Sequence, residues 1–524
     1  MALHPVSLHP RDGSIAADEL RHLLDALVER SEVPVEFPAE VLAAAEAAAA
    51  GPGAPDRTDH SERADHSGRV DRTDVEFVTL DPASSTDLDQ AMHLSRKGDG
   101  YRVLYAIADV PSFVGLDGPL DAETRRRGET VYLPDRRISL HPEVLSEGVA
   151  SILPEQDTPA FVWTFALDAT GAVTGTTLER ALVRSRAKLA YDAVQADLDA
   201  GTGLEMMQLL LEIGAKRREL EAQRRGASLN LPEQEVFADG EALRLQWRTP
   251  LPIEDANAQI SLMTGMEAAR IMIEGGAGIL RTMPAADEGS IRDLRRKAAA
   301  LGQPWPEDMV YGDFLRTLHW SDPRHLALLN QAAKLFRGAS YLAFTSPAEL
   351  PADPAEQVQA AIGAPYAHTT APLRRLVDRF VLLTCHHLLG GDDLPDALRT
   401  ALPLIPQVMQ ETGSRAGAIE RQAIDIVEAL ALRSSIGSEL EATVLTSSDG
   451  KAQLQLSEPP VTVRAAVPGN PGDVVRVRVE SVDPAAGKVQ IVPAAGRPAA
   501  GEGRTETAEA GQVQASAPGQ PAAS

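Results

Sequence analysis

The sequence predicts a multidomain α+β protein, and three observations carry that prediction. Leucines recur at helical spacing between Ser14 and Arg30, which indicates a helical N-terminal module. The long middle of the chain mixes strand and helix patterns, as a mixed α/β domain does. Short β runs then follow one another from Gly437 to Pro493, which predicts a small β-barrel of the OB-fold type. A chain of 524 residues with 44% hydrophobic residues is long enough to build several cores.

Changes in composition give the expected domain boundaries. We expect the helical module at residues 1–50, a charged linker at 51–74, the mixed α/β main domain at 75–436, the OB-fold module at 437–493 and a disordered tail at 494–524. The linker prediction rests on a near-repeat of Asp, His, Ser and Arg residues, which is typical of a solvated tether. The tail prediction rests on its high content of Ala, Gly, Pro and Glu.

The N-terminal module contains two expected helices. The first carries one apolar stripe, formed by Leu20, Leu23, Leu24, Leu27 and Val28. The second follows Pro38, a residue suited to a first helical turn, and is rich in alanine. The pair is compatible with a helix-turn-helix, but pairs of helices are common in proteins that bind no DNA.

Hydrophobic periodicity assigns the elements of the remaining chain. Val75 to Leu80 alternates as a strand with one buried face. We expect hairpin strands at 161–167 and 173–178, and helices at 187–198, 204–225, 253–280, 373–389 and 404–435. In the OB-fold module, strands are expected at 440–445, 452–456, 461–463 and 474–480.

The segment from Thr79 to Ala91 is the chemically richest part of the chain. Asp81, Asp87 and Asp89 fall close together just after the first expected strand. In an extended segment Asp87 and Asp89 place their carboxylates on one side, while Leu88 between them points to the core. Clustered carboxylates repel one another, and a bound hard cation such as Mg²⁺ relieves that repulsion. The alternative interpretation is a solvated acidic turn.

Two other acidic motifs fail on spacing. An EF-hand loop that starts at Asp81 needs Gly at its sixth position and Glu at its twelfth, where this chain has Thr86 and Met92. A phosphatase with an aspartyl nucleophile needs a second Asp two residues after the first, where this chain has Ala83.

Several motifs, taken in order, resemble the ribonuclease II/ribonuclease R (RNB) family. They are Leu80-Asp81-Pro82 followed by residues 87–91, then Tyr105 to Val110, Asp121 to Pro134, and Tyr366 to Arg375. The resemblance covers roughly residues 75–432 and implies that 75–436 is an RNB catalytic domain, closed by an RNA-binding OB-fold domain at 437–493. It implies a magnesium-dependent 3′→5′ exoribonuclease that hydrolyses single-stranded RNA to nucleoside 5′-monophosphates, with Mn²⁺ as an alternative ion.

The resemblance also implies roles for individual residues. Metal binding is expected of Asp81, Asp87 and Asp89, with Gln90 at the family's fourth acidic position, and catalysis of Asp89, Asp87 and Arg374. RNA binding is expected of Tyr132, Tyr191, Arg374 and Glu420. Because Gln90 is neutral, we expect it to hold a second cation less well than a carboxylate does, and Gln90→Asp to lower the magnesium requirement.

The chain departs from the family's pattern at several positions besides Gln90. The family's wedging phenylalanine is replaced by Leu229 or Asn230, and Gln259 or Ser261 stands where the family reads the ribose hydroxyl. The OB-fold segment contains no aromatic residue, although such domains often bind bases by stacking. These departures favour an alternative function, a catalytically silent RNA-binding or regulatory protein. A transcriptional regulator acting through the N-terminal helices is a third hypothesis.

Composition restricts the partners and the compartment. A net charge of −25 argues against a protein that coats nucleic acid nonspecifically, although a locally basic channel remains compatible with it. The single cysteine, Cys385, excludes an internal disulfide and fits a reducing compartment. No apolar run approaches the length of a membrane span. We expect a cytoplasmic monomer that binds single-stranded RNA.

Overall fold

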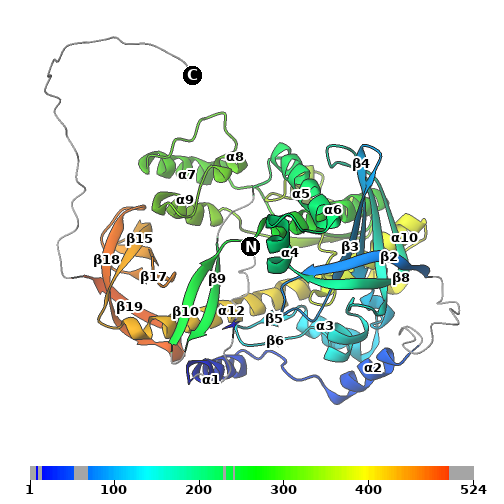
Figure 1. Cartoon of the computed structure of the whole chain (residues 1–524), viewed down its shortest axis with the longest axis horizontal. Coiled ribbons are helices and arrows are strands. Elements are labelled where there is room, and N and C mark those ends of the chain that lie inside the picture. Colours follow the sequence, from blue (N-terminus) through cyan, green and yellow to red (C-terminus); the bar gives the residue numbers. More distant parts are fainter. Residues whose placement is uncertain (1–7, 10–14, 52–68, 228–231, 240–241, 495–524) are drawn as a thin grey trace, which may run out of the picture.

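The computed structural model of the chain describes residues 8–9, 15–51, 69–227, 232–239 and 242–494. A five-stranded barrel lies on one side of the molecule and a five-stranded sheet on the other, and the long helix α12 extends between them (Figure 1). Helices come first, strand and helix then mix, and strands dominate the end, so the predicted multidomain α+β fold is confirmed. Within the described residues, no helix has both the length and the apolar character needed to cross a membrane.

The barrel is the core of the main domain. Its strands neighbour one another in the order β2-β3-β4-β7-β8 and close between β8 and β2, the single parallel pair. Alternate residues of each strand enter different cores: Val103 and Tyr105 of β4 pack in the largest one, and Leu104 and Ala106 in a second. The strands are β2 (Val70–Asp81), β3 (Gln90–Lys97), β4 (Gly100–Ala108), β7 (Asp157–Leu167) and β8 (Val173–Ala190).

Helices and short strands complete the main domain around the barrel. Buried residues of α5, α6 and α10 join the largest core, so these helices cover one face of the barrel. The helices are α3 (Gly118–Arg127), α4 (Tyr191–Asp199), α5 (Glu205–Gln223), α6 (Pro252–Gly275), α10 (Leu376–Gly390), α11 (Asp396–Ala401) and α12 (Ile405–Leu432). The short strands are β5 (Val131–Tyr132), β6 (Arg137–Ile138), β11 (Gly278–Thr282), β12 (Ser340–Phe344), β13 (Val358–Gln359) and β14 (Ala364–Pro365).

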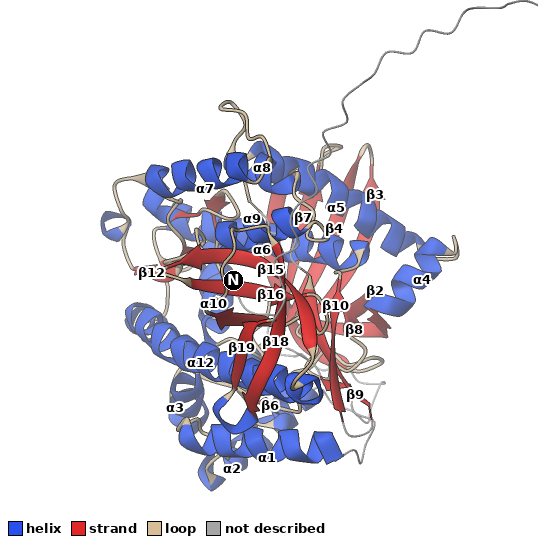
Figure 2. Ribbon diagram, turned by 90° about the vertical axis from the view of Figure 1, so that its left-hand side faces the viewer, coloured by secondary structure: helices blue, strands red, loops and turns tan. Residues whose placement is uncertain are grey.

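A helical lobe with its own core lies between β11 and β12 in the sequence. It consists of α7 (Glu288–Ala300), α8 (Tyr311–Arg316) and α9 (Pro323–Ala333). In its core the Trp305 and Phe314 rings stack with centroids 4.2 Å apart. In Figure 2 the lobe lies above the C-terminal sheet, and Leu326 and Ala327 of α9 pack against Leu445 of that sheet.

The C-terminal sheet has the strand content expected of an OB-type domain. Its strands are β15 (Glu439–Ser448), β16 (Lys451–Leu456), β17 (Thr462–Ala465), β18 (Val474–Asp483) and β19 (Lys488–Pro493), in the order β17-β16-β15-β18-β19. The edge strands β17 and β19 approach each other without a hydrogen-bonded ladder between them. The domain is therefore a strongly curved sheet close to a barrel.

The two N-terminal helices, α1 (Ile15–Arg30) and α2 (Ala39–Ala49), are present as predicted but pack on different parts of the protein. Leu20, Leu24 and Leu27 of α1 share a core with α12 and the C-terminal sheet. Val41 and Ala45 of α2 lie in the second barrel core instead. A helix-turn-helix needs its helices packed against each other, so the structure does not support that interpretation of a separate module.

Several element boundaries differ from the expectations. Strand β2 begins at Val70 and so includes the last residues of the expected linker, while residues 187–190, expected as helix, extend β8. Residues 278–282, expected as helix, form β11, and α10 starts at Leu376 rather than at 373. A hairpin of β9 (Glu233–Asp239) and β10 (Ala242–Arg248), joined by β1 (Leu8–His9), was not expected. Leu229, Asn230, linker residues 52–68 and tail residues 495–524 lie outside the described residues.

Candidate active site

The acidic loop connects the end of β2 to the start of β3. Asp81 is the last residue of β2 and Gln90 the first of β3, and the side chain of Leu88 between them is fully buried. The Leu88 N–H donates to Ser151 Oγ (2.8 Å), and that hydroxyl donates to the Thr86 carbonyl (2.9 Å). These bonds hold the second half of the loop in a single conformation.

Lys188 of β8 holds the first half of the loop. Its Nζ donates to the carbonyl oxygens of Ala83 (2.8 Å) and Ser85 (2.6 Å). Lys188 reaches the loop because β8 pairs with β2 in parallel, with Lys188 opposite Thr79. Neither Lys188 nor Ser151 was expected at the site, because no local pattern links either residue to a loop that is so distant in the sequence.

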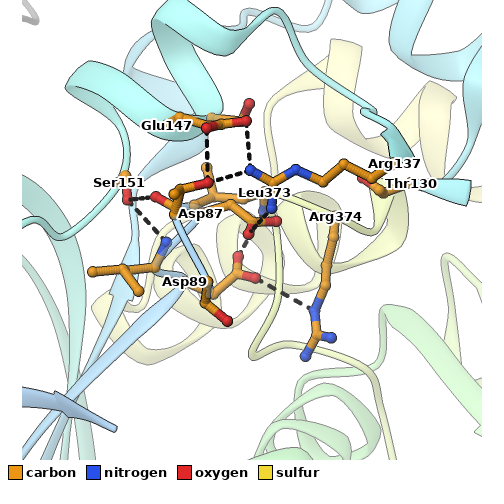
Figure 3. Close-up of polar contacts among 12 residues, drawn as sticks. Asp87, Asp89, Thr130, Arg137, Glu147, Ser151, Leu373 and Arg374 are labelled. Atoms are coloured by element: carbon orange, nitrogen blue, oxygen red, sulfur yellow. Dashed lines mark hydrogen bonds and ion pairs between the residues drawn. The ribbon is translucent and has the colours of Figure 1, made fainter. Parts of the chain in front are cut away.

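The segment before α10 lies against the acidic loop (Figure 3). The Leu373 N–H donates to Asp89 Oδ1 (2.7 Å), and Arg374 Nε lies 3.5 Å from Asp89 Oδ2. The Arg374 carbonyl accepts from the Thr130 N–H (2.9 Å), and the buried carboxylate of Asp378 accepts from the Ala371 N–H (2.8 Å). The segment is thus fixed on both sides, and Arg374, which is 46% exposed, projects from it toward solvent.

Asp81 and Asp89 are carboxylates held in a largely desolvated environment. Burial raises the pKa of Asp81 to about 6, against the opposing effects of Arg374 and Lys188. Burial also raises the pKa of Asp89 well above its ordinary value, although Arg374 and the Leu373 N–H both act to lower it. Asp81 Oδ2 is buried and has no hydrogen-bond partner among the described residues. Asp81 thus keeps an unpartnered oxygen, whereas Asp89 has Arg374 and the Leu373 N–H as partners.

Asp87 has a different environment from the other two aspartates. Its Oδ1 accepts from Arg137 Nη1 at 2.5 Å, and Arg137 Nη2 lies 2.5 Å from Glu147 Oε1 (Figure 3). Thr86 Oγ1 donates to Glu147 Oε2 (2.7 Å) and accepts from Arg137. Arg137 and Glu147 are charged residues of the site that sequence analysis missed, and only their position in the fold brings them to Asp87.

Gln90, the expected fourth metal ligand, faces the barrel. Its amide oxygen accepts a hydrogen bond from the hydroxyl of Tyr105, a residue buried in the largest core. This hydrogen bond between Gln90 and Tyr105 joins β3 to β4. The structure therefore gives Gln90 a partner other than a cation.

The expected RNA-binding residues lie around the same centre. The pKa of Tyr132 is raised to about 12, mainly by burial, while Arg374 opposes the rise through a hydrogen bond. The carboxylate of Glu420 in α12 accepts from the Tyr132 backbone, and burial raises its pKa to about 7. Tyr191, whose hydroxyl accepts from Asn257 Nδ2 (2.7 Å), lies on the Asp81 side, and burial followed by the Asp81 charge raises its pKa.

The two candidates for recognition of the ribose hydroxyl are engaged within the protein. Gln259 is buried and donates to Glu221 Oε2 (2.7 Å). Ser261 shares a hydrogen bond with the Thr370 hydroxyl (2.8 Å). Each side chain has one partner within the protein, and Gln259 Oε1 has none among the described residues.

Two carboxylates of the acidic loop have the chemistry of ligands for a hard cation. Within the described residues, no group of three or more His, Cys, Asp and Glu side chains is close enough together to hold a metal ion. Asp81 and Asp89 fit such an ion because both are oxygen donors with raised pKa and Asp81 has an unpartnered buried oxygen. Asp87 is held by Arg137, and its charge acts to raise the pKa of both Asp81 and Asp89.

Comparison with known proteins agrees with this architecture. The RNB domain matches residues 69–391, and the RNase II-type exonuclease C-terminal S1 domain matches residues 438–494. Ribonuclease R of Escherichia coli is 28% identical over 340 residues, which cover 60% of this chain and 39% of that protein. The chain thus spans about two fifths of the length of this relative.

Two solved structures are similar in fold. Mycoplasma genitalium RNase R in complex with ribose methylated single-stranded RNA superposes with a TM-score of 0.78 at 19% identity, covering 91% of this chain and 78% of that chain. Yeast Ssd1, described as a pseudonuclease, superposes with a TM-score of 0.64 at 14% identity, covering 88% of this chain and 58% of that chain. The same fold therefore occurs in a nuclease and in a pseudonuclease, so the residues of the site, and not the fold, distinguish the two functions.

Proposed function

This chain belongs to the RNB family of ribonuclease II-type exonucleases, and from that membership we propose that it is a magnesium-dependent 3′→5′ exoribonuclease. Its proposed substrate is single-stranded RNA, its products are nucleoside 5′-monophosphates, and its compartment is the cytoplasm. One observation carries the proposal: Asp89 is held by the Leu373 N–H and Arg374, and Asp81 Oδ2 in the same acidic loop is buried with no partner among the described residues. A purely structural aspartate pair would have both carboxylates satisfied.

Asp81 and Asp89 are the residues that would hold Mg²⁺ in this proposal. When bound, the ion supplies positive charge for the phosphoryl oxygens and lowers the pKa of a coordinated water. Arg374 is placed to bind the phosphate, because its guanidinium reaches from the fixed segment toward solvent beside Asp89. The Leu373 N–H keeps the Asp89 carboxylate oriented, so the charge distribution exists before the substrate arrives.

Tyr132, Tyr191 and Glu420 would position the end of the RNA. Tyrosine rings stack on any base, which gives binding without sequence preference. The Glu420 carboxylate, held by the Tyr132 backbone, is an acceptor for a hydroxyl of the terminal ribose. Tyr132 also contacts Arg374 through its hydroxyl, which links base stacking to the placement of the phosphate.

A second candidate function is a catalytically silent RNA-binding protein. Gln90 favours it because the amide that replaces a carboxylate is bonded to Tyr105. Arg137 also favours it, because the pairing with Asp87 leaves two carboxylates rather than three for metal.

Single-stranded RNA labelled at either end separates the two functions. With Mg²⁺, the proposed enzyme releases the 3′ label at once as a mononucleotide and shortens the 5′-labelled strand progressively, and EDTA stops both reactions. RNA that is bound but keeps its length with Mg²⁺ supports the silent protein. Loss of the 5′ label first contradicts the proposed direction.

A further inference from the structure

Arg137 is the one arginine in the described structure that bridges the acidic loop to a second acidic side chain. It lies in β6 and contacts Asp87, Thr86 and Glu147, while Arg374 contacts Asp89 (Figure 3). The three charged side chains are mostly buried, with exposed fractions of 22% for Arg137, 12% for Asp87 and 27% for Glu147. Charge pairs this shielded from solvent interact much more strongly than surface pairs.

The Arg137 guanidinium offsets part of the negative charge of two carboxylates, as a bound cation would. One guanidinium faces two carboxylates, and the Thr86 hydroxyl completes the ring of hydrogen bonds. Although burial opposes it, the pKa of Arg137 is raised by Asp87 and Glu147. Burial acts to raise the pKa of Glu147, but its hydrogen bonds with Thr86 and Arg137 lower that pKa overall. Arg137 and Glu147 are therefore stabilised in their charged forms.

Gln90 shows independently that this part of the site is not built for a further cation. A second divalent ion beside Asp87 needs more carboxylate oxygens. The residue at the fourth acidic position is neutral and bonded to Tyr105, and Glu147 is already paired with Arg137. An ion at this position would also lie next to the positive guanidinium, which repels it.

We propose that the Arg137 guanidinium takes the place of a second divalent cation beside Asp87, so that the centre binds a single divalent ion at Asp81 and Asp89. Arg137 is then a positioning residue: it fixes Asp87 and the Thr86 end of the acidic loop. The proposal rests on the proposed metal-dependent function for the choice of ligand. Its test is a count of bound ions, which needs no RNA and no turnover.

The count is made by titrating the full-length, metal-free protein with Mn²⁺ and measuring free Mn²⁺ by electron paramagnetic resonance. Wild type is expected to bind one ion at the centre, and Asp89→Asn is expected to lose it. Arg137→Gln is expected to gain a second ion, which disappears again in the Arg137→Gln, Asp87→Asn double variant. Arg137→Lys, which keeps the positive charge, is expected to bind one ion like wild type.

Arg136→Gln is the matched control, because the neighbouring arginine pairs with Asp25 and Asp135 away from the loop. It is expected to leave the ion count at one. Two ions bound by wild type would overturn the proposal if both are lost in folded variants of the centre. A folded Arg137→Gln protein that still binds one ion would overturn it as well. A wild-type protein that binds one ion but leaves RNA intact would instead refute the proposed function.

Discussion

The three aspartates of the acidic loop differ in what surrounds each carboxylate. Burial raises the pKa of both Asp81 and Asp89, although Arg374 acts to lower each. Asp87 has a full positive partner in Arg137. Residues that look equivalent in the sequence therefore take separate parts: two suit a cation, and one is bound within the protein. The environment of each carboxylate is therefore set more by the charge of its neighbours than by the spacing of the aspartates in the sequence.

Gln90→Asp tests whether the amide stands in for a metal ligand. The sequence favours a lower magnesium requirement in the variant. The structure predicts that the half-saturating Mg²⁺ concentration stays unchanged or rises, because residue 90 faces Tyr105 and a third charge would lie near two carboxylates that are already desolvated. A magnesium titration of RNA cleavage by wild type and variant decides between them. A clearly lower half-saturating concentration would restore Gln90 as a ligand position.

At the scale of elements, the site depends on the pairing of β2 with β8. This parallel pair places Asp81 opposite Ala190 and carries Lys188 to the loop carbonyls. Residues 187–190 have helical propensity, and the sequence predicts helix there. Pairing with β2 outweighs that propensity, since tertiary contacts routinely override local preference. Lys188 acts on the loop only because of this override.

Lys188→Met should loosen the acidic loop while keeping the length of the side chain. The variant loses two hydrogen bonds from a charged donor, so the free energy of unfolding should fall by about 1–2 kcal/mol. The half-saturating Mg²⁺ concentration should rise, because the loop no longer holds Asp81 and Asp89 in one arrangement. Urea unfolding and a magnesium titration measure the two effects. Lys97→Met, at the exposed end of β3, is the control and should change neither.

Local patterns predicted α1, α2, α4, α5, α6, α10 and α12, the hairpin of β7 and β8, four of the five strands of the C-terminal domain and the acidic loop. They did not predict α3, α7, α8, α9, α11, β19 or the hairpin of β9 and β10. The predicted features depend on residues near one another in the chain, where periodicity and turn residues are informative. Arg137, Lys188, Ser151 and Glu147 could not be predicted in the same way. These residues are distant from the loop in the sequence, and only the folded chain brings them to it. An isolated Arg or Lys in a sequence is most often a surface residue.

At the scale of the whole molecule, the C-terminal domain shares its core with the rest of the protein. Val444 and Leu454 of its sheet pack in one cluster with residues of α1, α12 and β10. Deletion of residues 437–524 would therefore expose apolar surface on the main domain, and the loss of RNA capture would be mixed with loss of stability. Point variants on the surface are better tests of the RNA-binding role.

A cluster of cations joins the helical lobe to this domain. The pKa of Lys334 in the lobe is lowered by burial and by the positive charges of Lys297, Arg464 and Arg337. In a chain with a net charge of −25, such a cluster is a natural contact for RNA phosphates. Combining Lys334→Glu with Arg464→Glu should weaken binding of long RNA at least about tenfold at low salt.

The same double variant should cleave short oligonucleotides at the wild-type rate, since these reach the active site without the cluster. Filter binding of long RNA and initial rates on short RNA measure the two outcomes. Arg476→Glu, at a 74% exposed arginine of β18, is the control for a general change of charge. Equal losses on long and short RNA would place the cluster in folding rather than in RNA capture.

The contact between α12 and the C-terminal sheet should make stability depend on pH. Burial raises the pKa of Glu428 to about 7, against a hydrogen bond from Gln234, which also donates to the Pro460 carbonyl. Because this folded pKa lies above the ordinary value of 4.5, stability is lost as the pH rises from 4.5 to about 7, and it stays lost above that. The loss is at most about 3 kcal/mol.

Glu428→Gln removes this charge and keeps a hydrogen-bond acceptor for Gln234. Its melting temperature should exceed that of wild type above pH 7, and the two should converge near pH 5. Differential scanning calorimetry across this range measures the difference. Glu480→Gln, at an exposed position of β18, should melt like wild type at every pH. A constant difference between Glu428→Gln and wild type would mean that Glu428 does not titrate in this window.

The most direct test of the proposed function is the identity of the product released in heavy-oxygen water. With Mg²⁺ and single-stranded RNA, wild type should release nucleoside 5′-monophosphates with one heavy oxygen on the phosphate, detected by mass spectrometry. Asp89→Asn should bind RNA but release at least about a hundredfold less product, because the metal site loses a charge while its volume is nearly unchanged. Nucleoside 3′-phosphates, cyclic phosphates, or equal product from Asp89→Asn would contradict the account.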